Sequence, residues 1–217
     1  PHPGRAVMPP FPYGDGAVME MTITSYTTIV IGLEDTLYDV GAGLTSHVYG
    51  EVLLDYMVQT LGFANQAAAK VVRDLYGTRH RSTIKALMIA AAECAFPNCN
   101  TFYVESWKAR LMEVDVAKFV KPNPALIEGL RRCPLRLVVA SMAPRDYVIR
   151  VLEALEVREF FPDRWIFGYE DTQPHVPPDR AAYAAILDGL QAQAEHVVVA
   201  DYWVPSLREA RKKKLPI

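Results

Sequence analysis

The strongest constraint on the fold is the way in which short β-branched runs alternate with helical stretches along the chain. The run Thr27–Ile31 is short and apolar enough for a strand that is buried on both faces. Beyond residue 124, helical stretches separate three further strand-like runs, which are Leu135–Ala140, Trp165–Phe167 and His196–Ala200. Strands that are separated by helices form parallel sheets. The sequence therefore predicts an α/β fold with a doubly wound parallel sheet.

Helical periodicity predicts the elements that surround this sheet. In the tract after the first strand, apolar residues recur three and four positions apart: Leu44, Val48, Val52, Leu53, Tyr56 and Met57. Further helices are predicted for the ranges Asn65–Tyr76, Ser82–Cys94, Thr101–Met112, Ala125–Arg132, Arg145–Leu155 and Arg180–Gln191.

The segment Phe119–Pro124 divides the chain because it interrupts the helical series. It contains Pro122 and Pro124, and the residue before a proline is disfavoured in the α conformation. We therefore predict a core made of residues 26–40 and 125–217. A helical cap, residues 41–124, is inserted after the first strand of that core.

Residues 1–25 have a different composition from the rest of the chain. They are rich in proline and glycine and show neither a helical period nor a regular strand pattern. We predict that they form an extended arm. Arg5 is the only Lys or Arg in this stretch, and no basic segment precedes an apolar one, so its composition is not that of a transit or signal peptide.

The overall composition narrows the range of partners. The chain has 23 basic and 25 acidic residues, and its formal charge of −2 argues against nucleic-acid binding through overall charge. No apolar run reaches the ~18 residues of a membrane span, so no span is predicted. The three cysteines, Cys94, Cys99 and Cys133, lack a second ligand pair for zinc, and we expect buried reduced thiols.

A ligand site is expected where the strands end, because doubly wound sheets bind ligands at the carboxyl ends of their strands. The residues that follow Ile31, Ala140, Phe167 and Ala200 should therefore line any site.

The segment after the first strand reads Gly32-Leu33-Glu34-Asp35-Thr36-Leu37-Tyr38. From about Tyr26 to the end, this segment and the order of the elements resemble the haloacid dehalogenase superfamily, in particular its pyrimidine 5′-nucleotidase-like branch with a helical cap. The family carries an Asp-x-Asp-x-Thr/Val loop at this place. Its first aspartate attacks phosphorus, its second is general acid and base, and the carboxylates help to hold magnesium.

The resemblance places Gly32 at the position of the nucleophile and Glu34 at that of the acid and base. Glycine has no side chain, so it cannot form the covalent intermediate. The extra methylene of Glu34 displaces its carboxylate by about a bond length, and a misplacement of ~1 Å can cost ~10²-fold in rate.

Three further positions follow the family's motifs only in part. Ser141 keeps the hydroxyl that the family uses to donate to phosphate. The place of the family's lysine is taken by Pro177, or by Val176 if the alignment shifts by one residue. Asp201 alone remains of the acidic residues that hold magnesium, with Ser206 at the later position. The resemblance therefore implies a degenerate site, and we expect no catalysis, no bound metal and no other cofactor.

Several other polar residues admit two interpretations. Asp35 is interpreted as a turn or helix-capping group rather than a shifted nucleophile. His47 and His175 are interpreted as solvated or structural histidines rather than a new acid/base pair.

The basic segment Tyr76–Arg81 corresponds to a part of the cap that helps to recognise substrate in the nucleotidase-like branch. We interpret it as a solvated loop that connects two helices. The alternative is that Arg79 and Arg81 meet a phosphate.

Two features near the C-terminus suggest contacts with partners. Tyr202 and Trp203 stand at the mouth of the expected crevice, where large rings would fill it or anchor a partner. The alternative for this pair is plain packing in the core. The last predicted helix is basic and contains Arg208, Arg211, Lys212, Lys213 and Lys214. Such a run is most often a solvated face, and its alternative role is contact with RNA phosphates or an acidic partner.

These observations lead to one hypothesis and two alternatives. The leading hypothesis is a catalytically inactive protein, a pseudoenzyme, that serves as a structural or interaction subunit of a larger assembly with other proteins. By analogy alone, we expect an organellar assembly such as a mitochondrial ribosome and a mitochondrial location, with the cytoplasm as the alternative. The alternative functions are a non-catalytic module that binds a nucleotide or phosphorylated metabolite, and a residual magnesium-dependent phosphatase that uses Glu34 or Asp35 with Asp201.

Overall fold

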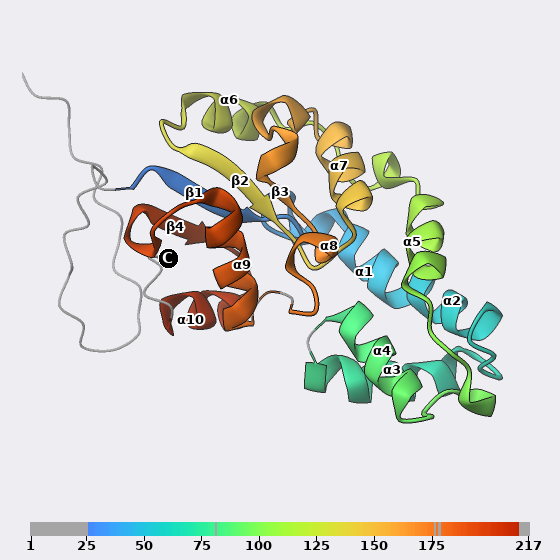
Figure 1. Cartoon of the computed structure of the whole chain (residues 1–217). Helices are drawn as coiled ribbons and strands as arrows, with labels where there is room; N and C mark the ends of the chain where they lie inside the picture. The colour runs from blue at the N-terminus through green and yellow to red at the C-terminus, as the bar shows by residue number, and fades with distance from the viewer. Residues whose placement is uncertain (1–25, 81, 176, 178, 213–217) are drawn as a thin grey trace, which may run out of the picture.

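A sheet of four parallel strands forms the centre of the structure, a computed structural model that describes residues 26–80, 82–175, 177 and 179–212. Its strands are β1 (Thr28–Gly32), β2 (Arg136–Ala140), β3 (Ile166–Phe167) and β4 (Val197–Ala200). Their order is β3-β2-β1-β4, so the chain runs outward from β1 to β3 and then returns to place β4 on the other side of β1 (Figure 1). The predicted doubly wound parallel sheet is confirmed.

The side chains of the sheet alternate between two covered faces. Val30 and Val138 belong to a buried cluster with residues of α9 (Arg180–Leu190) and α10 (Val204–Lys212). Ile31 and Val139 point to the opposite face, which α6 (Pro124–Arg132) and α7 (Arg145–Ala154) cover (Figure 1). Because both faces are buried, the strands read as continuous apolar runs rather than as alternating ones.

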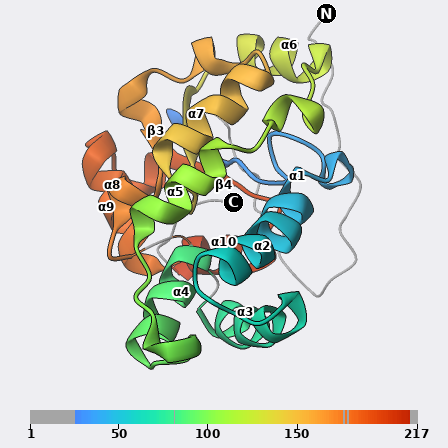
Figure 2. The same ribbon diagram turned by 90° about the vertical axis from the view of Figure 1, so that its right-hand side faces the viewer.

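The cap follows β1 and is helical, as predicted. Its first tract consists of α1 (Leu44–Ser46), a π-helical segment (His47–Val52) and α2 (Leu53–Gln59). The other cap helices are α3 (Gln66–His80), α4 (Thr83–Ala92) and α5 (Val104–Met112). In Figure 1 the cap lies to the right of the sheet, and Figure 2 views it from that side.

Local capping explains where two of these helices begin. The side chain of Asn123 accepts hydrogen bonds from the backbone N–H groups of Ala125 and Leu126, at 2.9 and 3.3 Å, and Pro124 occupies the first turn of α6. The hydroxyl of Ser82 accepts from the N–H of Lys85 at the start of α4.

The interpretation of the segment Tyr76–Arg81 as a connecting loop was wrong. Residues 76–80 form the last turn of α3, and Arg81 lies outside the described residues. Tyr76 is buried and its hydroxyl donates to Glu93 at 2.6 Å, which holds this turn against the end of α4. A long-range contact of this kind outweighs the local preference of Gly77 for a helix end.

The structure adds short elements that periodicity did not predict. They are α8 (Tyr169–Thr172) and the 3₁₀ turns Val40–Ala42, Pro97–Cys99, Val116–Lys118, Arg158–Phe160, Asp163–Trp165 and Ala194–His196. The cysteines also differ from expectation, since Cys94 and Cys99 are exposed and Cys133 is half-buried. Both have positive φ angles, Cys94 just after the end of α4 and Cys99 in the 3₁₀ turn Pro97–Cys99, and such turns lie at the surface.

The cap and the core contact each other through polar and apolar groups. The ammonium of Lys85 in α4 lies 2.8 Å from the carboxylate of Asp179, and Lys108 in α5 lies 2.9 Å from Glu170 in α8. The buried side chains of the cap and of the α7 face form one continuous hydrophobic cluster. The cap is therefore packed against the core. Its exact boundaries, residues 41–124, stay a prediction.

The structure tests the predictions about the N-terminal arm, the basic C-terminal helix and the membrane only in part. The predicted arm, residues 1–25, lies outside the described residues, as do Lys213 and Lys214. Within the part of the chain that the structure describes, no helix is long and apolar enough to cross a membrane.

Candidate functional site

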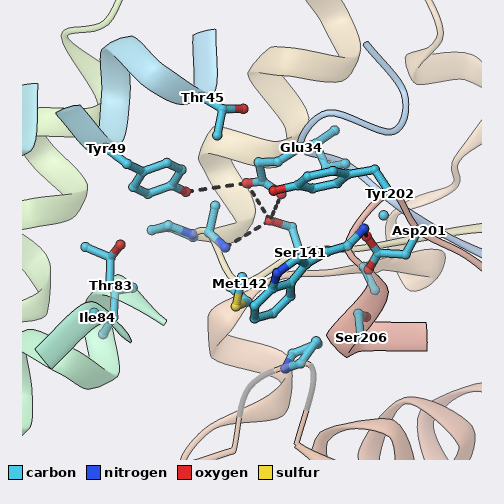
Figure 3. Close-up of a pocket in the computed structure, with 18 of the residues that line it drawn as sticks. Glu34, Thr45, Tyr49, Thr83, Ile84, Ser141, Met142, Asp201, Tyr202 and Ser206 are labelled. Atoms are coloured by element: carbon cyan, nitrogen blue, oxygen red, sulfur yellow. Dashed lines mark hydrogen bonds between the residues drawn. The ribbon is translucent and has the colours of Figure 1, made fainter. Parts of the chain in front are cut away.

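A cavity of about 550 Å³ lies between the cap and the carboxyl ends of three strands (Figure 3). In the parallel register Ile31 pairs with Val139 and with Ala200, so β1, β2 and β4 end level with one another. The residues that follow these strands line the cavity from the side of the core: Gly32, Leu33, Glu34, Ser141, Met142, Asp201, Tyr202 and Trp203. The cap contributes Thr45, Tyr49, Gly77, Thr78, Thr83, Ile84 and Trp107.

The expectation for β3 was wrong. The residues that follow Phe167 do not line the cavity, because β3 lies at the edge of the sheet beyond β2 and its chain continues directly into α8. The loop after α8 returns instead, and it places the buried Pro177 in the wall of the cavity. Pro177, which the resemblance places where the family has a lysine, therefore lies at the site, and it carries no charge.

Glu34 and Ser141 form the polar centre of the cavity. The hydroxyl of Ser141 lies 2.9 Å from each carboxylate oxygen of Glu34, and it accepts a hydrogen bond of 2.9 Å from the N–H of Ala143. The hydroxyl of Tyr49 reaches the same carboxylate from the cap at 3.5 Å (Figure 3). The hydroxyl that the resemblance assigns to phosphate is thus directed at a protein carboxylate.

Asp201 fills the space beside Gly32. A Cβ atom added to Gly32 would lie 3.1 Å from Cγ of Asp201 and 3.1 Å from the hydroxyl oxygen of Thr36, which is closer than such contacts normally are. Gly32 is the last residue of β1, and the described glycines with positive φ are Gly43 and Gly62. Space, rather than an unusual backbone angle, therefore favours glycine at position 32, since a Cβ there fits only if Asp201 or Thr36 moves.

Burial raises the pKa of both carboxyl groups at the site. For Glu34 the charges of Asp201 and Asp35 act in the same direction, while hydrogen bonds from its own backbone and from Ser141 partly oppose the rise in pKa. The pKa of Asp201 is raised by burial, and the N–H of Trp203, which donates to it at 2.9 Å, partly opposes this. Both carboxyl groups are thus held where ionisation is disfavoured.

Positive charge is missing from the described lining of the cavity. None of its described residues is Lys, Arg or His. Arg79 is exposed and lies over the ring of Tyr76, with 5.9 Å from its guanidinium carbon to the ring centre. The alternative role of Arg79 as a phosphate contact therefore has no support from its position, and Arg81 lies outside the described residues.

The side chains at the site do not fit the magnesium ion that the resemblance would imply. Magnesium needs well-placed carboxylates in octahedral geometry. Gly32 offers none, and both oxygens of Glu34 face the hydroxyl of Ser141. Across the described ranges, no group of three or more His, Cys, Asp or Glu is arranged to hold a metal ion.

The other polar residues that the sequence singled out lie away from the cavity. Asp35 accepts a hydrogen bond of 2.8 Å from Thr45, which ties the first loop to the cap. The ring of His47 stacks on Phe119, and its Nδ1 lies 2.9 Å from Glu51. His175 is exposed, and neither histidine lines the cavity.

Tyr202 and Trp203 line the cavity but leave it open. Tyr202 is 51% exposed, and its N–H donates to the hydroxyl of Thr36 at 3.0 Å. The pair does not fill the crevice, because a cavity of about 550 Å³ remains, and the exposure of Tyr202 does not agree with plain core packing for that residue. Arg208, Arg211 and Lys212 are exposed on α10, where the predicted basic helix is found.

Sequence reasoning missed the cap residues that face the cavity. Thr45 and Tyr49 are four residues apart and therefore lie on one face of the same helical tract. Trp107 comes from α5 and Ile84 from α4. The spacing of Thr45 and Tyr49 was a usable signal, whereas the other contributions depend on how the cap packs.

A parallel sheet with a helical cap over its strand ends, and a site at those ends, defines a class of capped α/β proteins. No family model and no curated protein matches the sequence. Solved structures do match it in fold. A haloacid dehalogenase-like hydrolase from Streptococcus pneumoniae is 15% identical, with a TM-score of 0.56, over 88% of this chain and 83% of that one.

Two further structures extend this comparison. A haloacid dehalogenase-like protein of unknown function from Agrobacterium tumefaciens is 14% identical, with a TM-score of 0.52, over 88% of this chain and 80% of that one. The UTR4 protein of Saccharomyces cerevisiae is 10% identical, with a TM-score of 0.53, over 88% of each chain. The chain has the haloacid dehalogenase-like fold, and the proposed nucleotidase-like branch stays a prediction.

Proposed function

We propose that this protein is a catalytically inactive member of the haloacid dehalogenase-like fold group, a pseudoenzyme. The proposal rests on Gly32, which the resemblance places at the position of the nucleophile, and the observation that supports it is that Asp201 and Thr36 crowd the space a side chain would need there. A covalent phosphoryl intermediate needs a side-chain nucleophile at this position. The neighbouring carboxylates cannot substitute for it without a cation to bring the phosphate close.

The second part of the proposal is a structural or interaction role in a larger assembly. Its support is a complete fold in which, by the resemblance, the family's nucleophile and lysine are missing, together with exposed groups at the two ends of α10. Tyr202 and Val204 are 51% and 53% exposed at its start, and the basic residues Arg211 and Lys212 are exposed at its end. Exposed aromatic and basic residues are enriched at protein and RNA interfaces. An organellar assembly, such as a mitochondrial ribosome, remains part of this proposal by analogy alone.

Native co-purification tests the interaction role. The tagged full chain, expressed in its own cells, is expected to elute with a partner at a fixed stoichiometry. Replacing Arg211 and Lys212 together by Glu is expected to weaken this association, because it reverses the charge of the proposed contact. Replacing the exposed pair Val71 and Leu75 of the cap helix α3 by Ser serves as the control.

A monodisperse free monomer in native extracts would overturn the interaction role. An equal loss of partner in both variants would place the contact elsewhere and reject the α10 surface. Fractionation of the same cells tests the mitochondrial location, and a purely cytoplasmic signal would contradict it.

A second candidate function is a non-catalytic binding module. The open cavity of about 550 Å³ favours it, since a cavity of this size is typical of small-molecule sites. Ser141 lies in its lining, although its hydroxyl is already bonded to Glu34 and to the N–H of Ala143. Calorimetry with nucleoside monophosphates tests the nucleotide form of this candidate, and an absence of heat at millimolar ligand would remove it.

A further inference from the structure

The ionisable side chains in the described lining of the cavity are all acidic or phenolic. Glu34 and Asp201 bring two carboxyl groups to it, and no described lining residue brings a cation. Their hydrogen-bond partners are neutral: the hydroxyls of Ser141 and Tyr49 at Glu34, and the N–H of Trp203 at Asp201. When these carboxyl groups ionise, their charge is therefore left for a ligand to neutralise.

One described cation that is close in sequence to the lining residues Thr83 and Ile84 is already paired with a carboxylate. Lys85 belongs to α4 beside the cavity, but its ammonium lies 2.8 Å from Asp179 and it does not line the cavity. A phosphate in the cavity would therefore face two carboxyl groups, with no compensating cation among the described lining residues. Electrostatics disfavour an anionic ligand at this place.

Aromatic side chains form much of the remaining wall. Tyr49, Trp107, Tyr202 and Trp203 come from the cap and from the loop after β4. The faces of such rings attract cations, and the attraction is greatest for Trp and for desolvated sites. Leu33, Ile84 and Met142 add apolar surface for the body of a ligand.

We propose that this cavity binds an organic cation, an ammonium group carried on an apolar or aromatic body. The ammonium lies at Glu34 and Asp201, and the body contacts the aromatic wall. This inference rests on the binding-module candidate above and replaces its phosphorylated ligand by a cationic one. A bound cation also opposes the effect of burial on the two carboxyl groups, so it favours their ionised forms.

Three probes that share one ring system separate charge from shape. Tryptamine carries an ammonium, tryptophol a neutral hydroxyl and indole-3-propionate a carboxylate on nearly identical side chains. Calorimetry with the full chain at neutral pH is expected to give a Kd for tryptamine about tenfold lower than that for tryptophol. Indole-3-propionate and uridine monophosphate are expected to bind more weakly than tryptophol.

Charge-neutralising variants locate the effect in the cavity. Glu34→Gln and Asp201→Asn, made separately, are expected to reduce the preference for tryptamine over tryptophol to less than about threefold. Asp188→Asn removes a carboxylate from the exposed surface of α9 and is the matched control that keeps the preference. A thermal melt of each variant shows that it is folded, and two independent variants keep the test valid if one is not.

Several outcomes would overturn the inference. Equal Kd values for tryptamine and tryptophol, tighter binding of either anion, or a preference that survives in both cavity variants each contradict a cation site. Failure of all three indole probes to bind at millimolar concentration also rejects it. These results leave the absence of phosphatase activity untouched, whereas hydrolysis of phosphate esters would refute the pseudoenzyme proposal whatever the indoles do.

Discussion

The hydroxyl oxygen of Ser141 lies 2.9 Å from both carboxylate oxygens of Glu34. One hydroxyl from the end of β2 thereby joins the loop after β1, and a buried carboxyl group receives a donor that it needs. The resemblance would assign the same hydroxyl to phosphate. In this chain a phosphate could reach that hydroxyl only by displacing the carboxylate of Glu34, as the pseudoenzyme proposal requires.

Replacing Ser141 by Ala tests this relationship. The change removes the donor to Glu34 and the acceptor of the Ala143 N–H, so it should lower the free energy of unfolding by about 1–3 kcal/mol. Urea denaturation measures the loss. Ser46→Ala, which removes an exposed hydroxyl bonded to the Gly43 carbonyl, is the matched control and should change it by less than about 0.5 kcal/mol. Equal effects of the two changes would contradict the role given to Ser141.

Restoring both loop aspartates should not restore activity. The double variant Gly32→Asp, Glu34→Asp returns the family's carboxylates but leaves Pro177 where the family has a lysine. We expect no magnesium-dependent hydrolysis of p-nitrophenyl phosphate or a nucleoside monophosphate. Rapid hydrolysis by this variant would show that the cavity remains competent, and the binding-module candidate would then take precedence.

The same position makes a prediction about stability. A side chain at residue 32 meets Asp201 and Thr36 at 3.1 Å, so Gly32→Ala should lower the free energy of unfolding by about 1–3 kcal/mol. In an Asp201→Ala background the cost should fall, because one of the two crowding groups is gone. A double-mutant cycle of unfolding free energies measures this coupling, and strictly additive effects would argue against contact between the two residues.

The raised pKa of Glu34 predicts a pH dependence of stability. The folded state holds the proton of Glu34 above its ordinary pKa of 4.5, where the unfolded state releases it, so this group's contribution to stability falls as pH rises. The Glu34→Gln variant has no proton to release at this position, so its stability does not fall with pH for this reason. Thermal unfolding of both proteins at about pH 5 and about pH 8 should show the variant gaining stability relative to the native chain at the higher pH. A constant difference between the two pH values would contradict the raised pKa.

Glu170, where the cap meets the core, has a lowered pKa and therefore the opposite pH dependence of stability. Burial alone would raise its pKa, but the N–H of Arg145 and the ammonium of Lys108 outweigh burial and lower it. Its contribution to stability is therefore present above the ordinary pKa and is lost as pH falls through the lowered value. Glu170→Gln should cost about 0.5–1 kcal/mol near pH 6 and less near pH 3, as measured by denaturant unfolding. A cost that grows towards low pH would refute this assignment.

The sheet and the helical cap could be predicted from the sequence because they depend on local patterns. The apolar runs around Val30 and Val138 are continuous, as strands buried on both faces require, and the helices show their own period. The positions of Ser141, Pro177 and Asp201 at the cavity followed from the resemblance together with the rule for strand ends.

The remainder depends on packing that no local pattern encodes. The continuation of α3 through Gly77 relies on the bond from Tyr76 to Glu93, which joins two helices. The crowding of Gly32 by Asp201 relies on the level ends of β1 and β4. The contribution of Trp107 to the cavity depends on the closure of the cap, which the ion pairs of Lys85 and Lys108 help to hold.

The central claim is that the native site does not hydrolyse phosphate monoesters by way of its own carboxylates. The most direct measurement is the initial rate with p-nitrophenyl phosphate and with nucleoside monophosphates, for the full chain in magnesium. The account predicts a rate equal to that of the buffer, and equal rates for Glu34→Gln, Asp35→Asn and Asp201→Asn. Magnesium-dependent turnover by the native chain that any of these three changes abolishes would contradict the account and establish a residual phosphatase.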